Sequence, residues 1–320
     1  MKISILDAET LGDDLSYDKL QELGETAIFQ NTSPNEVTAN IGDSDVVILN
    51  KVKLNENNLK NCHNLKLICV AATGYDNIDI TYCRSKGIAV CNVVGYSTNS
   101  VAQVTIAMAL SLLTNLPSYT RFVNDGSYTK SGIANRLTPV YHEIAGKVWG
   151  VVGLGNIGKQ VARVAKAMGC RVISFKRTPD RDFPCCNLSY MFKNADIISV
   201  HLPLSSDTNG IISKELIDSM KPDAVLINVA RGAVCDENAL TEAVLQNRIG
   251  GIGIDVYSKE PFTEEHPFYK LLDHPNVCLT PHMAWGAYEA RCRCLDEIVE
   301  NIKAFYNGAS RNRLDERKDI

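Results

Sequence analysis

Short runs of Val and Ile alternate with longer segments at helical spacing along almost the whole chain. Apolar runs of this kind, without a polar residue at every second position, are typical of strands that are buried on both faces of a parallel sheet. Neighbouring parallel strands need a crossover connection, and the helical segments between the runs supply it. The alternation therefore predicts an α/β protein built from doubly wound parallel sheets.

The runs fall into two series. The first contains the predicted strands 2–6, 45–50, 65–72 and 88–92, and the second contains KVWGVVGL, RVISF, DIISVHLP, AVLINVA, GGIGIDV and NVCLT. Between them lie an apolar helix predicted over 98–115 and a polar stretch, 124–141, predicted to be irregular. A long helix is predicted over 286–306, and the charged tail RNRLDERKDI is expected to be frayed. Since 320 residues exceed what one core usually organises, we expect two domains, with a single large domain as the alternative.

The charge of the chain gives it little attraction for anionic polymers or membranes. Its 33 Lys and Arg against 37 Asp and Glu leave a net charge of −4. Nucleic-acid and membrane-surface binding both need a positive field, so we expect neither partner and favour a small-molecule site. The most apolar segment, 104–113, is much shorter than the roughly 20 residues that span a bilayer. The N-terminal apolar stretch is short and is interrupted by Asp7, so it does not suit a signal peptide and we expect a cytoplasmic protein.

Eleven cysteines are scattered through the sequence without a repeated CxxC spacing. An odd, scattered set favours reduced thiols over a disulfide framework or a zinc site, and no metal is predicted. Cys185 adjoins Cys186, and Cys292 lies close to Cys294, so a redox switch is the alternative for either pair.

A glycine-rich loop indicates a nicotinamide dinucleotide. Gly153, Gly155 and Gly158 spell GxGxxG directly after a predicted strand and at the start of a predicted helix. The first glycine suits a tight turn, the second admits a pyrophosphate, and the third allows the helix to pack closely. The N–H groups at the start of that helix, at Asn156 and Ile157, would face the phosphates. A glycine-rich turn without a ligand is the alternative.

The end of the next strand bears on the choice between NAD and NADP. RVISF runs into Lys176, Arg177 and Thr178, where NAD sites normally place an acidic residue for the ribose 2′-hydroxyl. Two cations and a hydroxyl suit a 2′-phosphate instead. The sequence therefore favours NADP(H), with Lys176 or Arg177 as the discriminating contact. If these are solvated turn residues, NAD(H) is possible.

Three polar residues follow separate strands of the second series. Arg231 comes after AVLINVA, Glu260 a few residues after GIGIDV, and His282 after NVCLTP. Open α/β sheets bind ligands beyond the carboxyl ends of their strands, so the three should emerge at the edge that carries the glycine loop. Reduction of a 2-keto acid needs a proton donor such as imidazole, a carboxylate to orient it and a guanidinium for the substrate carboxylate. Taken singly, loop salt bridges explain Arg231 and Glu260 equally well.

These motifs, in this order, resemble the D-isomer-specific 2-hydroxyacid dehydrogenase family. The likeness covers nearly the whole chain and includes LICVAATGYDNID, GYSTNSVAQ, VVGLGNIGKQVA, HLPLSSDTNGII, LINVARGAVCDENAL, GGIGIDVYSKEP and NVCLTPHMAW. The resemblance implies a Rossmann-type nucleotide-binding domain over residues 97–285. It also implies a flavodoxin-like, discontinuous substrate-binding domain over residues 1–96 and 286–320.

The resemblance also implies roles for matching residues. Arg231 binds the substrate, Glu260 orients His282, and His282 is the general acid or base. The backbone amides around Thr73 and Gly74 would grip the substrate carboxylate, and Asp255 would meet the nicotinamide. Further residues would line the cofactor groove: His201, Leu202, Pro203, Leu204, Thr208, Val229 and Ala230. Gln103 departs from the family, in which many members carry Glu, and nothing in the sequence explains it.

Trp285 narrows the resemblance to one branch. In TPHMAW its position resembles that in hydroxypyruvate and glyoxylate reductases, also called glycerate dehydrogenases, where a large ring would shorten the pocket. Ordinary interface packing is the alternative for this ring. We expect reduction of hydroxypyruvate or glyoxylate to the D-2-hydroxy acid, by a homodimer whose interface covers the apolar helix. A nucleotide-sensing corepressor on the same fold, or a formate or phosphite dehydrogenase, are the alternatives.

Overall fold

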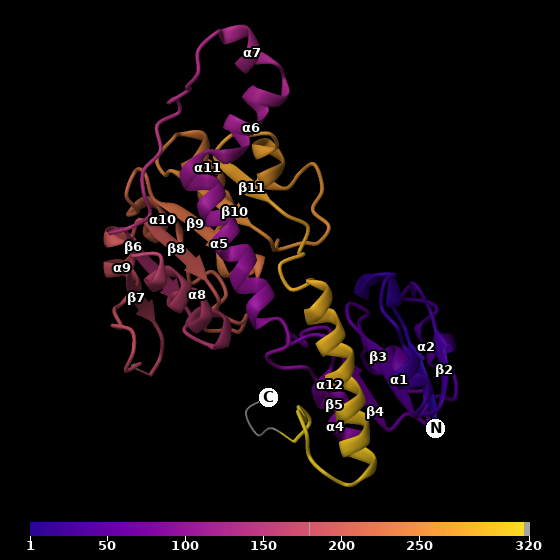
Figure 1. Ribbon diagram of the computed structural model, residues 1–320. Helices are drawn as coiled ribbons and strands as arrows, with labels where there is room; N and C mark the ends of the chain where they lie inside the picture. The colour runs from indigo at the N-terminus through magenta and orange to yellow at the C-terminus, as the bar shows by residue number, and fades with distance from the viewer. Residues whose placement is uncertain (179, 317–320) are drawn as a thin grey trace. The chain divides into compact units, whose positions relative to one another are not determined.

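The computed structural model describes residues 1–178 and 180–316. The chain forms two compact units, one made of Met1–Ser97 with Gly286–Ile320 and the other of Thr98–Trp285. We call them unit 1 and unit 2 and describe each by itself (Figure 1). Each contains one parallel sheet with helices between successive strands, so the predicted fold class is confirmed.

The sheet of unit 1 has five parallel strands in the order β2, β1, β3, β4, β5. Their bounds are Lys2–Ile5 for β1, Glu25–Ile28 for β2, Val46–Leu49 for β3, Leu67–Val70 for β4 and Ala89–Cys91 for β5. Every residue of β3 and β4 is buried, as their continuous apolar runs predict. Strand β2 was not predicted, because its sequence, ETAI, lies at the sheet edge and is mostly exposed.

Short helices connect the strands of unit 1. They are α1 (Asp18–Gln21), α2 (Val37–Ile41), α3 (Glu56–Leu59) and α4 (Ile80–Ser85), with a 3-10 turn, η1, over Ala8–Leu11. The long helix α12 (Tyr288–Tyr306) also belongs to this unit and packs against β4 and α1. Figure 1 shows α12 in yellow, next to the label of β4, against which it packs.

The expectation of a frayed tail is wrong for residues 311–316. Leu314 is fully buried in the core of unit 1, and its N–H donates to the carbonyl of Val90 at 2.8 Å. The Asp315 carboxylate accepts from the N–H of Val90 at 2.8 Å and pairs with Arg313. Arg313 and Asp315 are therefore partners of each other, and Asp315 also binds the edge strand β5, which composition alone does not reveal. Residues 317–320 lie outside the described residues.

The sheet of unit 2 has six parallel strands in the order β11, β10, β9, β8, β6, β7. Their bounds are Val148–Val152 for β6, Arg171–Phe175 for β7, Ile197–Val200 for β8, Val225–Asn228 for β9, Gly251–Ile254 for β10 and Val277–Leu279 for β11. All six were predicted. The strand order reverses between β6 and β8, and such a switch point is where open α/β sheets bind ligands, beyond the carboxyl ends of the strands.

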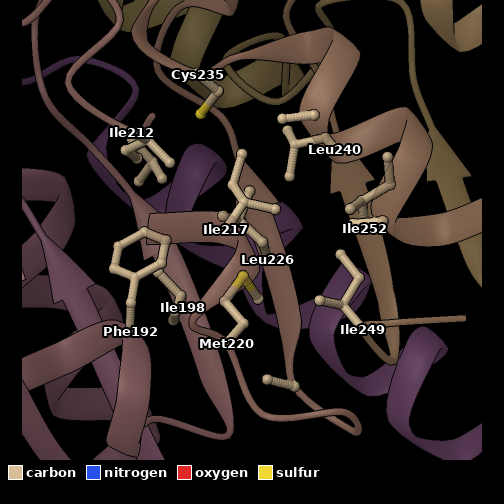
Figure 2. Packing of buried hydrophobic residues seen from close by; sticks show 14 of the residues in the cluster. Phe192, Ile198, Ile212, Ile217, Met220, Leu226, Cys235, Leu240, Ile249 and Ile252 are labelled. Carbon is tan, nitrogen blue, oxygen red and sulfur yellow. The ribbon is translucent and has the colours of Figure 1, made fainter. Parts of the chain in front are cut away.

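Helices cover both faces of this sheet. On one face lie α5 (Thr98–Thr114) and α8 (Asn156–Ala167), and on the other lie α9 (Leu188–Asn194), α10 (Lys214–Asp218) and α11 (Glu237–Leu245). The 3-10 turns η2 (Gly232–Val234) and η3 (Pro267–Leu271) complete the second face. Figure 2 shows its core, where Phe192 of α9, Ile217 of α10 and Leu240 of α11 meet Leu226 and Ile252 of the sheet.

Helix α5 continues into a projecting arm. Helix α5 packs against α8 and the sheet. Much of its second half is only half-buried. Its buried residues are Ser100, Val101, Ala102, Thr105, Met108 and Ala109. The next helices are α6 (Leu116–Asn124) and α7 (Ser127–Ser131), so the expectation of an irregular stretch is wrong for α7. Within the described residues, no single helix is long and apolar enough to cross a membrane. Together α5 and α6 reach that length and composition, but they are bent by 67° at their junction.

Candidate active site

The glycine loop joins β6 to α8 at the switch point of unit 2. Gly153 has a φ of +94°, and a Cβ there would lie 2.9 Å from the carbonyl carbon of His201, just beyond β8. A Cβ at Gly158 would lie 2.1 Å from the carbonyl oxygen of Gly153. The Cβ position of Gly155, in contrast, has no heavy atom within 4 Å. At Gly153 and Gly158 the loop thus packs tightly on the rest of the protein. At Gly155 there is free space, and this is where a pyrophosphate would approach the backbone.

Helix α8 adds a positive end to this opening. It begins at Asn156, with Gly155 as N-cap and no side chain hydrogen-bonded to the cap. Ile157 is half-buried and packs against the core that α8 shares with α5. The first N–H groups of the twelve-residue helix therefore remain available to an anion, which fits the phosphates of a dinucleotide.

An acidic residue lies at the end of β7, where the sequence led us to expect none. Asp180 follows two residues after the predicted Lys176, Arg177 and Thr178. Its side chain is only 6% exposed and lies 2.9 Å from Nζ of Lys159, on α8, and 3.7 Å from Nζ of Lys176. Lys159 lowers the pKa of Asp180 below its usual range. Lys176 is therefore a partnered cation, while Arg177 and Thr178 are exposed.

The segment after β8 contains the predicted groove residues 201–204 and 208. His201 and Leu202 are half-buried, and Pro203 and Leu204 are exposed. Thr208 is buried, and its hydroxyl donates to the carbonyl of Pro203 at 2.6 Å and accepts from the N–H of Ser205 at 2.8 Å. The Thr208 side chain therefore shapes the turn that presents Pro203 and Leu204.

The imidazole of His201 lies at the end of a polar chain that starts inside the core. Nε1 of Trp149 donates to Oγ of Ser199 at 2.9 Å, and that oxygen lies 3.0 Å from Nε2 of His201. Within the described residues, the buried Nδ1 of His201 has no hydrogen-bond partner. Burial lowers the pKa of His201 to about 3, so this imidazole is neutral at physiological pH.

Arg231 follows β9 in a turn whose backbone is hydrogen-bonded by the side chain of Asn228. The buried Asn228 side chain accepts from the N–H of Ala230 at 3.0 Å and donates to the carbonyl of Arg231 at 2.8 Å. Val229 is buried, whereas Ala230 and Arg231 are half-buried. Asn228 was not singled out from the sequence, although a polar residue that ends an apolar strand is a detectable signal. Its amide determines the path on which Arg231 leaves the sheet.

Glu260 and His282 lie in direct contact. Nδ1 of His282 lies 2.7 Å from Oε2 of Glu260, and the other carboxylate oxygen accepts from the N–H of Tyr257 at 3.0 Å. Both side chains are partly exposed, 21% for His282 and 31% for Glu260. They follow β11 and β10, and Arg231 follows the adjacent β9. The arrangement provides an oriented acid–base pair, His282 and Glu260, at the carboxyl edge of the sheet. The neighbouring strand β9 is followed by Arg231, which supplies a guanidinium.

Asp255 is buried beneath the turn that carries His282. Its carboxylate accepts from the hydroxyl of Thr280 at 2.6 Å, from the N–H of Met283 at 2.8 Å and from the N–H of Ala284 at 2.9 Å. Burial raises the pKa of Asp255 although these hydrogen bonds favour its ionised form. His282 has a φ of +51°, which is unfavourable for a residue with a Cβ, so the turn depends on such supports.

The predicted substrate residues lie in both units. In unit 2, Trp285 is half-buried and packs against the core formed by α5 and α8. In unit 1, Thr73 and Gly74 follow β4, and the Thr73 hydroxyl donates to the carbonyl of Val93 at 2.8 Å. The roles of Thr73, Gly74 and Trp285 toward a substrate stay predictions.

Comparison with known proteins agrees with these features. The sequence model for the D-isomer specific 2-hydroxyacid dehydrogenase, NAD binding domain, matches residues 106–284. The chain is 32% identical to the hydroxypyruvate reductase of Blautia hydrogenotrophica over 98% of this chain and 99% of that one. It is 33% identical to the glycerate dehydrogenase of Methylorubrum extorquens, over 97% and 98% of the two chains.

A solved structure gives the same result. The NADPH-dependent glyoxylate/hydroxypyruvate reductase of Sinorhizobium meliloti, in complex with NADP and malonate, matches with a TM-score of 0.81 and 29% identity, over 95% of this chain and 93% of that one. Both the nucleotide-binding half and the remainder of the chain are thus matched, over 95% or more of this chain. With its glycine loop at the switch point and its paired His282 and Glu260, the protein belongs to the D-isomer-specific 2-hydroxyacid dehydrogenase family of oxidoreductases.

Proposed function

We propose that this protein reduces hydroxypyruvate or glyoxylate to the D-2-hydroxy acid, with NADPH as the preferred reductant. The observation that carries the proposal is the 2.7 Å contact between His282 and Glu260 at the carboxyl edge of a dinucleotide-binding sheet. A dehydrogenase of this kind needs a proton donor at the sheet edge where the cofactor binds. The names of the relatives, hydroxypyruvate reductase and glycerate dehydrogenase, support the choice of substrate.

The residues of the site divide the work as follows. Glu260 holds Nδ1 of His282, so Nε2 is the nitrogen that gives its proton to the substrate oxygen during reduction. Arg231 binds the substrate carboxylate and polarises the carbonyl beside it, because its planar fork matches a carboxylate. Trp285 limits the length of the substrate.

The dinucleotide would be held by the loop of Gly153 and Gly155 and by the first N–H groups of α8. When bound, its reduced nicotinamide supplies the hydride. Arg177, which is exposed at the end of β7, would meet a 2′-phosphate together with Lys176. Because Asp180 already pairs with Lys176, we expect a moderate preference for NADPH and measurable use of NADH.

Initial rates over a panel of 2-keto acids, with NADH and NADPH in parallel, test this function. We expect hydroxypyruvate or glyoxylate to give the highest kcat/KM. His282→Ala should lower kcat by about 100-fold or more while NADPH still binds. Binding of NADPH without turnover of any 2-keto acid would support a nucleotide-sensing protein instead, and reduction of NADP by formate or phosphite would indicate a different dehydrogenase.

We also infer that the protein is a homodimer formed through the arm of unit 2, which we define as residues 116–141. Tyr119 and Arg136 brace the arm: the Tyr119 hydroxyl donates to the carbonyl of Pro139, and the Arg136 guanidinium lies 4.1 Å from the centre of the Phe122 ring. Large apolar side chains are nevertheless exposed along it: Leu116 59%, Val123 55%, Ile133 66%, Leu137 77% and Val140 68%. A folded arm with this surface suits a second copy of the same arm.

A further inference from the structure

A buried carboxylate behind the site, Glu237, holds the loop that carries Glu260. Glu237 is the first residue of α11 and is 9% exposed. One of its oxygens accepts from the N–H of Ser258 at 2.9 Å, and the other accepts from the Ser258 hydroxyl. Glu237 therefore binds both the backbone and the side chain of a residue two positions before Glu260.

His266 completes this cluster from the other side. Its Nδ1 accepts from the N–H of Phe268 at 3.2 Å, so the ring proton lies on Nε2, which is 3.1 Å from Oε2 of Glu237. The imidazole is thus a donor to the carboxylate and is itself held in place by the backbone of η3. The Glu237 carboxylate has three donors at defined positions and little freedom to rotate.

The neighbouring residues Tyr257 and Ser258 connect this cluster to all three candidate catalytic residues. The backbone N–H of Tyr257 donates to Glu260 at 3.0 Å, and the Tyr257 hydroxyl donates to the carbonyl of Thr280 at 2.9 Å. The same Thr280 carbonyl accepts from the N–H of His282 at 3.0 Å. The loops of Glu260 and His282 therefore share one tyrosine.

Arg231 is connected through its neighbour. A Cβ on Gly232 would lie 2.0 Å from the carbonyl carbon of Tyr257 and 2.1 Å from the nitrogen of Ser258, so the Gly232 backbone packs directly on this peptide. The Tyr257–Ser258 peptide is held between Gly232 and the Glu237 carboxylate. If it moves, the turn after Arg231 and the carboxylate of Glu260 lose their common support.

We propose that Glu237, acting through Ser258, is a positioning residue that holds Glu260 against His282. The proposal rests on the proposed function, since it concerns the same acid–base pair. Glu237 contacts neither member of the pair, and its effect on catalysis passes through the 257–260 loop. Its removal should therefore affect kcat more than the KM for the keto acid.

A double-mutant cycle tests the proposal with the full-length protein, hydroxypyruvate and NADPH. We expect Glu237→Gln to lower kcat about tenfold and to leave the affinity for NADPH within about twofold. In a Glu260→Gln background the same change should lower kcat less than about twofold, because its target is gone. Glu242→Gln, on the same helix but with a side chain 57% exposed, is the matched control and should keep the parent activity.

A second pair of variants keeps the test decisive if Glu237→Gln does not fold. Ser258→Ala removes one hydroxyl and should lower kcat about threefold to tenfold, whereas Ser258→Thr keeps the hydroxyl and should restore it. An equal loss from Glu237→Gln in both backgrounds, or no loss in the parent, would overturn the positioning role. If Glu260→Gln alone leaves kcat unchanged, the proposed acid–base pair fails as well, so the two failures are distinguishable.

Discussion

The carboxylate of Asp255 accepts a hydrogen bond from the N–H of Met283, the residue that follows His282, at 2.8 Å. This bond ties the strained turn of His282 to the end of the neighbouring strand β10. Asp255→Ala should therefore destabilise the protein by about 2–4 kcal/mol, because buried N–H groups lose their acceptor. It should also lower kcat at least about tenfold.

Thermal melts and initial rates measure both effects. Asp223→Ala, an exposed site in the turn before β9, is the control and should change neither. An Asp255→Ala protein with wild-type stability would show that the turn of His282 keeps its conformation without the hydrogen bonds to Asp255.

Asp180 should weaken the preference for NADPH, since it neutralises two lysines near the end of β7. Asp180→Asn releases Lys159 and Lys176, which are 2.9 Å and 3.7 Å from it, to a 2′-phosphate. We expect the Kd for NADPH to fall about threefold to tenfold and the Kd for NADH to change little. Fluorescence titration of both cofactors gives the ratio. Weaker NADPH binding in the variant would mean that Asp180 orders these lysines for the phosphate instead.

His201 should make the protein less stable in acid. Its pKa is about 3 in the folded state and about 6.5 when exposed, so between these values the unfolded chain binds a proton that the folded protein does not. Stability therefore falls as the pH falls below 6.5, by up to about 1.4 kcal/mol per pH unit.

The variant His201→Gln removes this proton uptake. The difference in unfolding free energy between the wild type and the variant should change by about 2 kcal/mol between pH 7.5 and pH 5. Denaturant unfolding at the two values measures it, and the exposed His142→Gln should show no such change. Parallel behaviour of His201→Gln and the wild type would contradict the prediction.

The arm of unit 2 should determine the oligomeric state. Leu137 is 77% exposed, and Leu137→Asp places a charge where a second copy would bury it. We expect light scattering to give a dimer for the wild type and a monomer for the variant. Leu272→Asp is the control, because Leu272 is 49% exposed but lies outside the arm, directly after η3. This variant should remain a dimer. A monomeric wild type would reject the assembly.

Leu314 should be essential for the stability of unit 1, although it lies in a charged tail. It is fully buried, so Leu314→Ala should cost about 2–5 kcal/mol of unfolding free energy. Arg311→Ala, which removes an exposed ion pair with Glu297, should cost about 1 kcal/mol or less. Chemical denaturation compares them. Equal, small losses would mean that the tail contributes little.

The inner strands of unit 2 could be predicted from the sequence because burial on both faces leaves an apolar run, as in VLI of β9. Its edge strands β7 and β11 are only partly buried, but their Val, Ile, Leu and Phe residues still mark them as strands. The edge strand β2 could not, because ETAI is mostly exposed and its strand form depends on pairing with β1.

The candidate site shows the same division. Arg231, Glu260 and His282 could be singled out because each follows a predicted strand, and strand ends meet at one edge. Asp180 and Glu237 could not, because each acts through a residue distant in sequence: Asp180 folds back on Lys159, and Glu237 reaches Ser258 across 21 positions. Such pairings are properties of the folded chain, and no local pattern contains them.

The discontinuity of unit 1 has a consequence for synthesis. Its central strands leave the ribosome first, but α12 and Leu314, which complete its core, are made only after unit 2 has been translated. At about 5–20 residues per second, the roughly 190 residues between them take about 10–40 s. During this time residues 1–97 lack the segment that completes their core, and the surface against which Leu314 packs stays uncovered while unit 2 becomes free to fold. A chaperone that binds exposed apolar strands would find its substrate in this interval.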